Sequence, residues 1–141
     1  MQREPRGQIG QSVRVGDRVV LVRETADGEL TIEVTEQWSR SLTRGVLPTD
    51  DTPIGAAVWD EDGLVASVGP AVESVRVTLT DGTMLEPELR EVENSAAQYV
   101  IVPLSPGVQP KTLTSLAAGG IELATNEYRS TESIRRQRDV P

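Results

Sequence analysis

The sequence predicts an all-β fold, an antiparallel β-sandwich or partly open barrel of eight or nine short strands. Short runs rich in Val, Leu and Ile alternate with polar residues at the two-residue period of a half-buried strand. Asp-Gly or Gly-Gly pairs lie between several of these runs, as they do in β-hairpin turns. No convincing 3.6-residue apolar period, which would indicate an amphipathic helix, occurs in the body of the chain.

The chain has 141 residues, the usual size of one domain. We expect the β domain to occupy residues 17–127, between two flexible arms. Residues 1–16 are polar, contain one Pro and three Gly, and show neither the helical nor the strand period of apolar residues. They predict a polar arm or a loosely attached first strand. Residues 128–141 form a basic tail. Its helical candidate, residues 130–138, has one large apolar residue, so we expect disorder there.

Turn signals define the first two hairpins. Residues 18–23 (RVVLVR) form an apolar run rich in β-branched residues, and residues 29–34 (ELTIEV) alternate between apolar and polar. The segment Ala-Asp-Gly between them predicts a hairpin turn. Residues 56–59 and 64–68 are apolar runs on either side of an Asp-Glu-Asp-Gly turn, which predicts a second hairpin.

Three further segments complete the predicted sheet structure. Residues 74–79 (SVRVTL) and 84–87 (MLEP) flank a Thr-Asp-Gly-Thr turn, and the proline that ends the second run limits that strand to a sheet edge. The uninterrupted apolar run at 99–102 (YVIV) predicts a fully buried strand. Residues 112–116 and 121–124 flank two glycines and predict a closing hairpin.

Residues 39–53 (SRSLTRGVLPTDDTP) contain Gly and two Pro with few periodic apolar residues. They predict a long connection, and long connections in compact domains are often functional or mobile. We therefore take this loop as a candidate binding segment.

Composition excludes several classes of function. The chain has 14 Lys or Arg against 22 Asp or Glu, and its net charge of −8 argues against a nucleic-acid or anionic-membrane surface. The absence of Cys and His excludes thiolate nucleophiles, His-based triads and His- or Cys-ligated metals. No cofactor is predicted. No apolar run is long enough for a membrane span, and the N-terminal residues do not resemble a signal peptide.

Motifs from about Val58 onward follow a recognisable order. They are VGP at 68–70, VRVTLTDG at 75–82, YVIVPL at 99–104 and the hairpin at 112–123, and the stretch over which they occur is about half of the chain. This order resembles a domain of uncharacterised envelope-associated proteins of GC-rich Gram-positive bacteria. The resemblance implies a β-sandwich module that is often tethered beyond a membrane, and hence a location in the cell envelope; without it we expect a cytoplasmic protein. It brings no catalytic or ligand residues.

Clustered carboxylates are the only candidates for catalysis. Asp50-Asp51 and Asp60-Glu61-Asp62 could supply the two acids of a carboxylate-dependent hydrolase, although a chain with four aromatic residues offers few platforms for a sugar. The spacing of Asp60 and Asp62 before a Gly also resembles the start of a calcium loop, but lacks the later acidic ligand. A solvated loop and a hairpin turn explain these acids equally well or better.

We expect a non-enzymatic protein-interaction module in which a sheet edge, such as the one bearing Pro87, or the 39–53 loop meets a protein partner. One alternative is a structural subunit of a homo-oligomeric assembly locked by its terminal arms, and another is the hydrolase. The two Trp residues are core plugs or, if exposed, binding anchors, and the basic tail could attach to an acidic surface. The predicted partner-binding residues are Trp38, Asp50, Asp51, Trp59, Arg135, Arg136 and Arg138.

Overall fold

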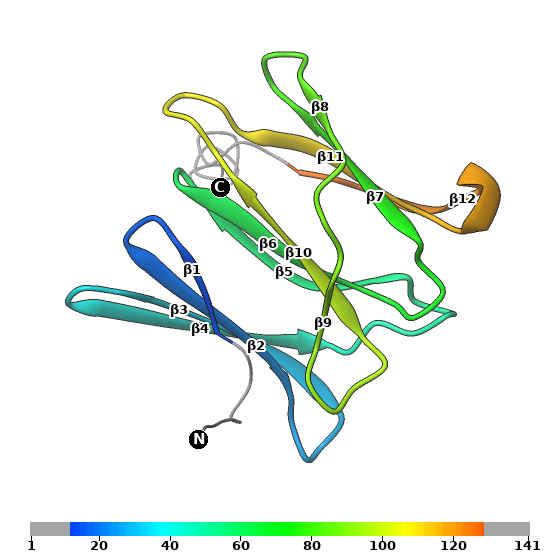
Figure 1. Ribbon diagram of the computed structural model, residues 1–141, viewed down its shortest axis with the longest axis horizontal. Coiled ribbons are helices and arrows are strands. Elements are labelled where there is room, and N and C mark those ends of the chain that lie inside the picture. Colours follow the sequence, from blue (N-terminus) through cyan, green and yellow to red (C-terminus); the bar gives the residue numbers. More distant parts are fainter. Residues whose placement is uncertain (1–11, 129–141) are drawn as a thin grey trace, which may run out of the picture.

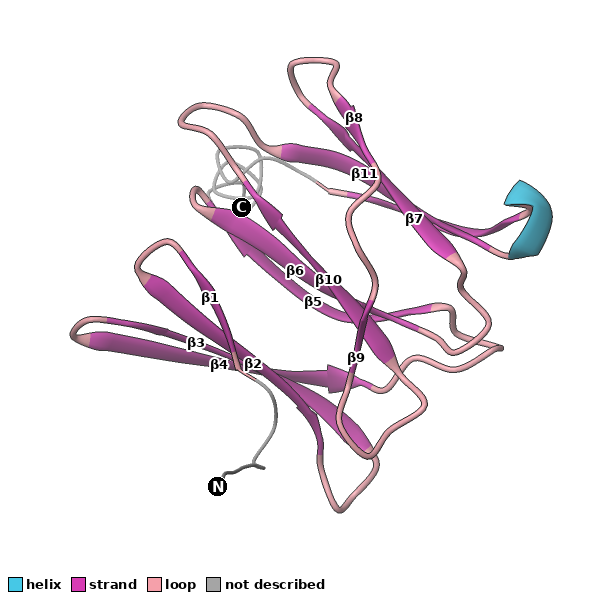
Figure 2. Cartoon of the chain, in the orientation of Figure 1, coloured by secondary structure: helices cyan, strands magenta, loops and turns pink. Residues whose placement is uncertain are grey.

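The computed structural model describes residues 12–128 and confirms the all-β prediction. These residues form twelve strands and one 3₁₀ turn, η2, and include no helix long enough and apolar enough to cross a membrane. Figure 2 shows strands throughout, with the single helical turn between the last two. The elements are β1 (Val13–Val15), β2 (Arg18–Glu24), β3 (Glu29–Glu36), β4 (Ser39–Val46), β5 (Ile54–Asp60), β6 (Gly63–Val68), β7 (Ser74–Leu79), β8 (Met84–Leu85), β9 (Arg90–Glu91), β10 (Gln98–Pro103), β11 (Pro110–Leu116), η2 (Ala118–Gly120) and β12 (Glu122–Glu127).

The strands form three antiparallel sheets of four strands each. Sheet A has the order β1-β2-β3-β4, sheet B the order β5-β6-β10-β9, and sheet C the order β12-β11-β7-β8. Figure 1 shows them as three layers, with sheet B between the other two. The fold is therefore a sandwich with one more layer than the usual two-sheet arrangement.

Sheet B is buried on both faces, which explains its continuous apolar strands. In β6, Leu64 and Val68 pack in the core between sheets B and C, whereas Val65 packs in the core between sheets A and B. In β10, Val100 and Tyr99 divide between the two cores in the same way. Since neighbouring residues of a strand point to opposite faces, a strand covered on both sides needs apolar residues at nearly every position.

All four predicted hairpins are present as β2–β3, β5–β6, β7–β8 and β11–β12. The buried strand predicted at 99–102 is the centre of β10. Pro87 follows β8, a two-residue strand at the edge of sheet C, as its missing N–H group requires. The prediction of eight or nine strands misses β1, β4 and β9. Of these, β1 lies in the 1–16 segment, where an attached first strand was one of two expectations, and it pairs with β2.

The prediction of a long connection over residues 39–53 is wrong for its first half, because residues 39–46 form β4. This strand alternates between large outward residues and small inward ones instead of apolar and polar. Its small residues face sheet B, and a Cβ atom on Gly45 would lie only 2.9 Å from the Cβ of Ala56. Close packing of two sheets there leaves no room for the large apolar residues by which a strand is usually recognised. Residues 47–53 remain as a short connection to β5.

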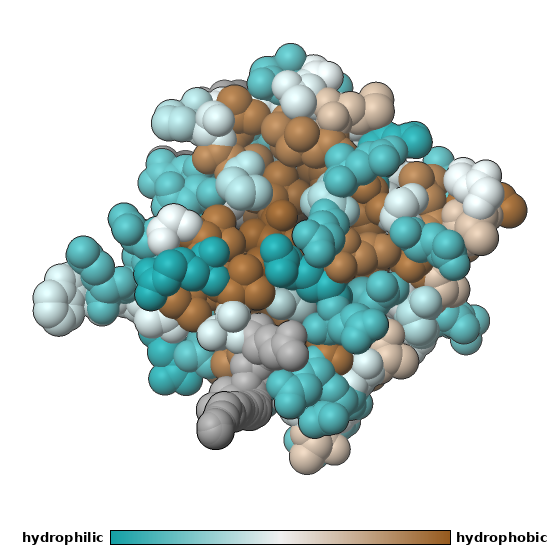
Figure 3. All heavy atoms as spheres, in the orientation of Figure 1, coloured by the Kyte–Doolittle hydropathy of each residue, from teal (hydrophilic) through white to brown (hydrophobic). Residues whose placement is uncertain are grey.

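The view in Figure 3 shows apolar side chains between the layers and polar side chains over the turns around them. The two cores are built almost wholly from Val, Leu, Ile and Ala, as a chain with four aromatic residues requires. Sheet A belongs to one core only, and no element of residues 12–128 packs on its opposite face.

Candidate interaction surface

The β3–β4 hairpin ends in a turn that exposes Trp38. Glu36 and Ser39 are the last paired residues of the two strands, so Gln37 and Trp38 alone form the turn. Trp38 is 95% exposed, and the turn is the outermost part of the molecule at the left of Figure 1. The prediction that Trp38 plugs the core is therefore wrong, because the hairpin carries this residue beyond both cores. Its position suits the alternative prediction, an exposed binding anchor.

The turn also holds an unfavourable backbone conformation. Gln37 has a positive φ of 25°, and Trp38 does not share the positive φ. A positive φ at the first turn residue alone is typical of a type II′ hairpin turn, where Gly is preferred. A residue other than Gly in this region costs about 1–3 kcal/mol. Contacts within the described structure explain neither the strained backbone of Gln37 nor the exposure of Trp38.

Strand β4 is the longest edge strand of the described structure and has a regular register. Its eight residues pair with β3 without a shift, and no strand of residues 12–128 pairs with its other side. The edges formed by β1, β8 and β9 are only two or three residues long. The remaining edges, β5 and β12, have register shifts in their pairing. Short strands and irregularities of this kind normally protect a sheet edge, and β4 has neither.

The outer face of sheet A is lined by arginines around an apolar residue of β4. Arg40, Leu42 and Arg44 share this face because they alternate along the strand. The nearest acidic groups belong to β3: Arg40 Nε lies 2.8 Å from Glu33 Oε2, and Arg44 Nε lies 3.8 Å from Glu29 Oε1. An open hollow of about 420 Å³ occupies this face. It is lined by Arg23, Glu24, Thr25, Ala26, Thr31, Glu33, Arg40, Leu42 and Arg44.

The charge of the chain is distributed unevenly between sheet A and the remaining structure. Residues 12–46, which include all of sheet A, carry five Arg against six acidic residues, a net charge of −1. Residues 47–128 carry three basic residues against thirteen acidic ones, a net charge of −10. The outer face of sheet A therefore differs in charge from the acidic surface of sheets B and C.

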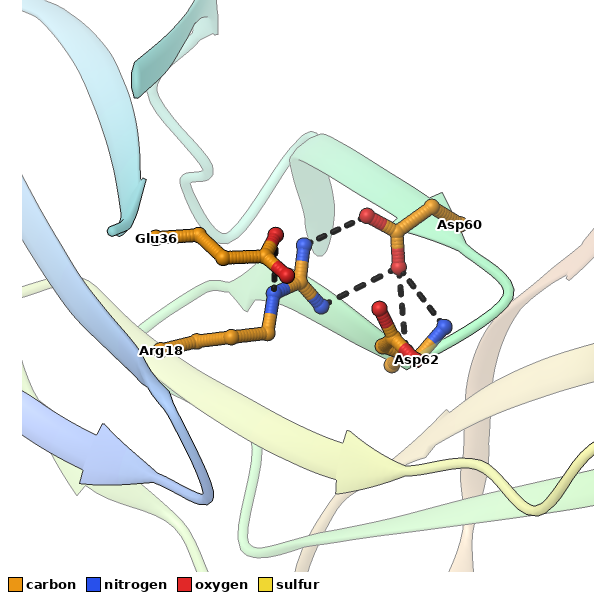
Figure 4. Close-up of polar contacts among 5 residues, drawn as sticks. Arg18, Glu36, Asp60 and Asp62 are labelled. Atoms are coloured by element: carbon orange, nitrogen blue, oxygen red, sulfur yellow. Dashed lines mark hydrogen bonds and ion pairs between the residues drawn. The ribbon is translucent and has the colours of Figure 1, made fainter. Parts of the chain in front are cut away.

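A second polar cluster joins sheet A to sheet B (Figure 4). Arg18, the first residue of β2, donates from both terminal nitrogens to the carboxylate of Asp60 at the end of β5, at 3.0 Å for the Nη1 contact. Asp60 Oδ1 also accepts the backbone N–H groups of Asp62 and Gly63, at 2.9 and 3.2 Å. Glu36 lies 3.8 Å from Arg18 Nε. This is a bidentate ion pair that fixes the β5–β6 turn against the first sheet.

The surroundings of Asp60 favour its ionised form. Partial burial would raise the pKa of Asp60, but the hydrogen bonds from Asp62, Arg18 and Gly63 and the charge of Arg18 outweigh it, so the pKa is lowered. A carboxyl group held in this way is a poor proton donor at neutral pH. The cavity beside it, between sheets A and B, has a volume of about 30 Å³, far below the size of a substrate pocket.

The structure favours the turn explanation for the two acids of the proposed calcium loop. The Asp60 carboxylate is already occupied by Arg18 and two N–H groups, so a cation would have to displace the guanidinium. Within residues 12–128, no three acidic side chains lie close enough together to hold a metal ion. Asp60 lines the 30 Å³ cavity and Asp50 and Asp51 do not, so this cavity does not bring together the two acids proposed for the hydrolase.

The other predicted residues have separate positions. Asp50 and Asp51 are exposed in the connection between β4 and β5. Trp59 is half-buried against the core between sheets B and C, which agrees with its prediction as a core residue. The basic residues of the tail lie outside the described residues; they are Arg135, Arg136 and Arg138.

Sequence reasoning missed Arg40, Leu42 and Arg44, the residues that the structure groups beside Trp38. The signal was present, because R-S-L-T-R alternates at the two-residue period of a strand. Only Leu42 among the three outward residues is apolar, so the segment lacks the alternation of apolar and polar residues by which a strand is usually recognised. Arg18 was missed because its partner is 42 residues away in the sequence.

Comparison with family models, with curated proteins and with solved structures found no match to this chain. The resemblance to envelope-associated domains therefore stays a prediction.

Proposed function

We propose that this protein is a non-enzymatic interaction module that binds an extended segment of a partner protein along β4. The observation that supports the proposal is the combination of a long, regular and unpaired edge strand with a turn that exposes Trp38 almost completely. A partner strand added to such an edge gains backbone hydrogen bonds along its length. Exposed Trp residues are frequent anchors of protein interfaces.

The pairing register indicates which backbone groups of β4 a partner would meet. In a hairpin with a two-residue turn, the residues next to the turn form a hydrogen-bonded pair, and such pairs then alternate along the strands. Since Glu36 and Ser39 flank the turn, Arg40, Leu42 and Arg44 direct their N–H and C=O groups away from β3. These three residues thus offer both their backbone groups and their side chains on the accessible part of the edge.

Three features support a binding function over catalysis. The chain has no His or Cys, and its best-placed carboxylate, Asp60, is held in its charged form by Arg18. The cavity beside Asp60 has a volume of only about 30 Å³, too small for a substrate. The surface around β4, by contrast, is open and carries exposed apolar and charged groups together, as protein interfaces do.

The charges of β4 favour a different protein as the partner over a second copy of the chain at this edge. An antiparallel pair of β4 strands centred on Leu42 would place Arg40 of one copy opposite Arg44 of the other. Like charges directly opposite each other destabilise a strand pair. The alternative of an assembly locked by the terminal arms depends largely on residues outside those described and stays a prediction.

Selection from a display library of random unstructured peptides tests the proposal on the full chain. Selected peptides should bind the wild-type protein, lose binding to Leu42→Pro, and bind Leu42→Thr within about fivefold of wild type. Pro removes the central edge N–H group and is tolerated at a sheet edge, whereas Thr keeps the N–H group. Trp38→Ser should weaken binding while leaving the thermal midpoint unchanged. Peptides that bind Leu42→Pro as well as wild type would contradict the proposal.

A further inference from the structure

We infer that β4 selects an acidic partner strand with the pattern acid-x-apolar-x-acid, in which x is any residue that tolerates an extended conformation. The inference rests on the proposed function and adds the chemistry of the ligand. It comes from the order of the three outward residues of β4, in which Leu42 lies between Arg40 and Arg44.

The spacing of the pattern follows from strand geometry. Residues directly opposite each other on neighbouring strands have Cβ atoms about 4.5–5.5 Å apart, and successive residues of a strand point to opposite faces. A partner strand beside β4 therefore places its residues i, i+2 and i+4 next to Arg40, Leu42 and Arg44. Because this order reads the same in both directions, the pattern suits a partner strand of either orientation.

Both guanidinium groups are accessible to a partner carboxylate. The side chains of Arg40 and Arg44 are 64% and 60% exposed, and in both the nitrogen closest to the β3 carboxylate is Nε. The acids Glu33 and Glu29 lie on β3, on the side of β4 opposite to the open edge. A partner carboxylate can thus approach the terminal nitrogens of each Arg, the end of the group that binds carboxylates in a bidentate manner.

A polypeptide fits this surface better than another anionic ligand. The apolar Leu42 is 53% exposed between the two arginines, and the backbone groups of the edge are open. A nucleic acid would use neither feature, and the net charge of −10 on residues 47–128 would repel a long polyanion. A short acidic strand instead places its few charges at the arginines and an apolar side chain at Leu42.

The test measures binding of a labelled, end-blocked peptide with the core Glu-Thr-Val-Thr-Glu to the full chain by fluorescence anisotropy. The comparison peptides have Lys or Gln in place of both Glu residues. At two positions the peptide side chain opposite an Arg is attracted if it is Glu and repelled if it is Lys. We therefore expect the Glu peptide to bind about 30-fold more tightly than the Lys peptide at low salt. The preference should decrease as salt is added.

A double variant, Arg40→Gln with Arg44→Gln, should reduce the preference for Glu over Lys to within about threefold. The matched control is Arg76→Gln, which removes an exposed Arg from the outer face of sheet C and should leave the preference unchanged. Equal binding of the Glu and Lys peptides by the wild-type protein would overturn the inference, as would a preference that survives the double variant. Library peptides that need the β4 edge but lack the acidic pattern would overturn the inference alone and leave the proposed function standing.

Discussion

The ion pair between Arg18 and Asp60 offers a direct test of how sheet A is held against sheet B. In the variant Asp60→Asn, the amide oxygen can still accept the N–H groups of Asp62 and Gly63, so the β5–β6 turn keeps its hydrogen bonds. The variant removes only the negative charge and one of the two oxygens that accept hydrogen bonds from Arg18. The change in stability therefore reports mainly on the contact between the two sheets.

The expected loss lies between the values for exposed and buried ion pairs. The Arg18 side chain is 16% exposed and that of Asp60 is 49% exposed. Breaking a buried pair costs about 3–5 kcal/mol and an exposed pair about 0–1 kcal/mol. We expect Asp60→Asn to lower the free energy of unfolding by about 2 kcal/mol, since Arg18 would be left mostly buried without its partner. The corresponding decrease in the thermal midpoint is about 5–10 °C.

The dependence on pH provides the independent part of the test. The pKa of Asp60 is lowered in the folded protein: burial alone would raise it, but its hydrogen bonds and Arg18 outweigh this. The unfolded chain then binds the proton more readily, so the contribution of Asp60 is fully present above about pH 4 and is lost as the pH falls through the lower folded pKa. The stabilities of wild type and Asp60→Asn should therefore converge in acid.

Urea unfolding of both proteins, followed by circular dichroism from neutral to acidic pH, measures this difference. Glu61→Gln is the matched control, because Glu61 is exposed in the same turn, and it should change the stability by less than about 0.5 kcal/mol. A loss below about 0.5 kcal/mol for Asp60→Asn, or a loss that does not change on acidification, would refute the reasoning.

Three further substitutions test other parts of the structure. Gln37→Gly should raise the free energy of unfolding by about 1 kcal/mol in urea titrations, because Gly adopts the positive φ of 25° without strain; no gain would show that the turn is relaxed. Gly55→Ala should cost about 1–3 kcal/mol in the same assay, because the new Cβ would lie 2.5 Å from Val46 O and 2.7 Å from Pro48 Cδ. Burial raises the pKa of Tyr128 to about 12, against about 10 in an unfolded chain, so the unfolded state ionises first and stability falls by roughly 2–3 kcal/mol between pH 10 and 12. Tyr128→Phe should remove most of that alkaline loss, and an unchanged loss would count against the burial of the hydroxyl.

The hairpins could be predicted from the sequence because each is a local unit. The β2–β3 hairpin is an example: alternating residues define the two strands, and Gly28, with a φ of 83°, supplies the conformation that the turn requires. The number of layers could not be predicted in the same way. It depends on the pairing of β6 with β10, in which Leu64 lies opposite Val102, a contact between distant parts of the chain.

The candidate site is harder to predict from the sequence than the fold, for a physical reason. Charged or aromatic clusters in expected loops indicate the segment 39–53, but its composition does not indicate that residues 39–46 form the strand β4. Trp38 is among the binding residues that the sequence predicts, and this stays a prediction; its expected place in the core is wrong, because its exposure depends on how far the hairpin extends beyond sheet B. The pairing of Arg18 with Asp60 required the packing of two sheets, which no local pattern specifies.

The charged side chains of β4 determine which strands can pair with its exposed edge. A long regular edge favours indiscriminate pairing with other strands, and charged side chains on the edge normally oppose it. Arg40 and Arg44 provide that protection against a second copy of β4, because identical strands would place these arginines opposite each other. The same two charges become attractive toward a strand that carries acids at the matching positions. Under the proposed function, a single pair of residues thus both discourages self-association at the edge and selects the partner, so that specificity arises from repulsion as well as attraction.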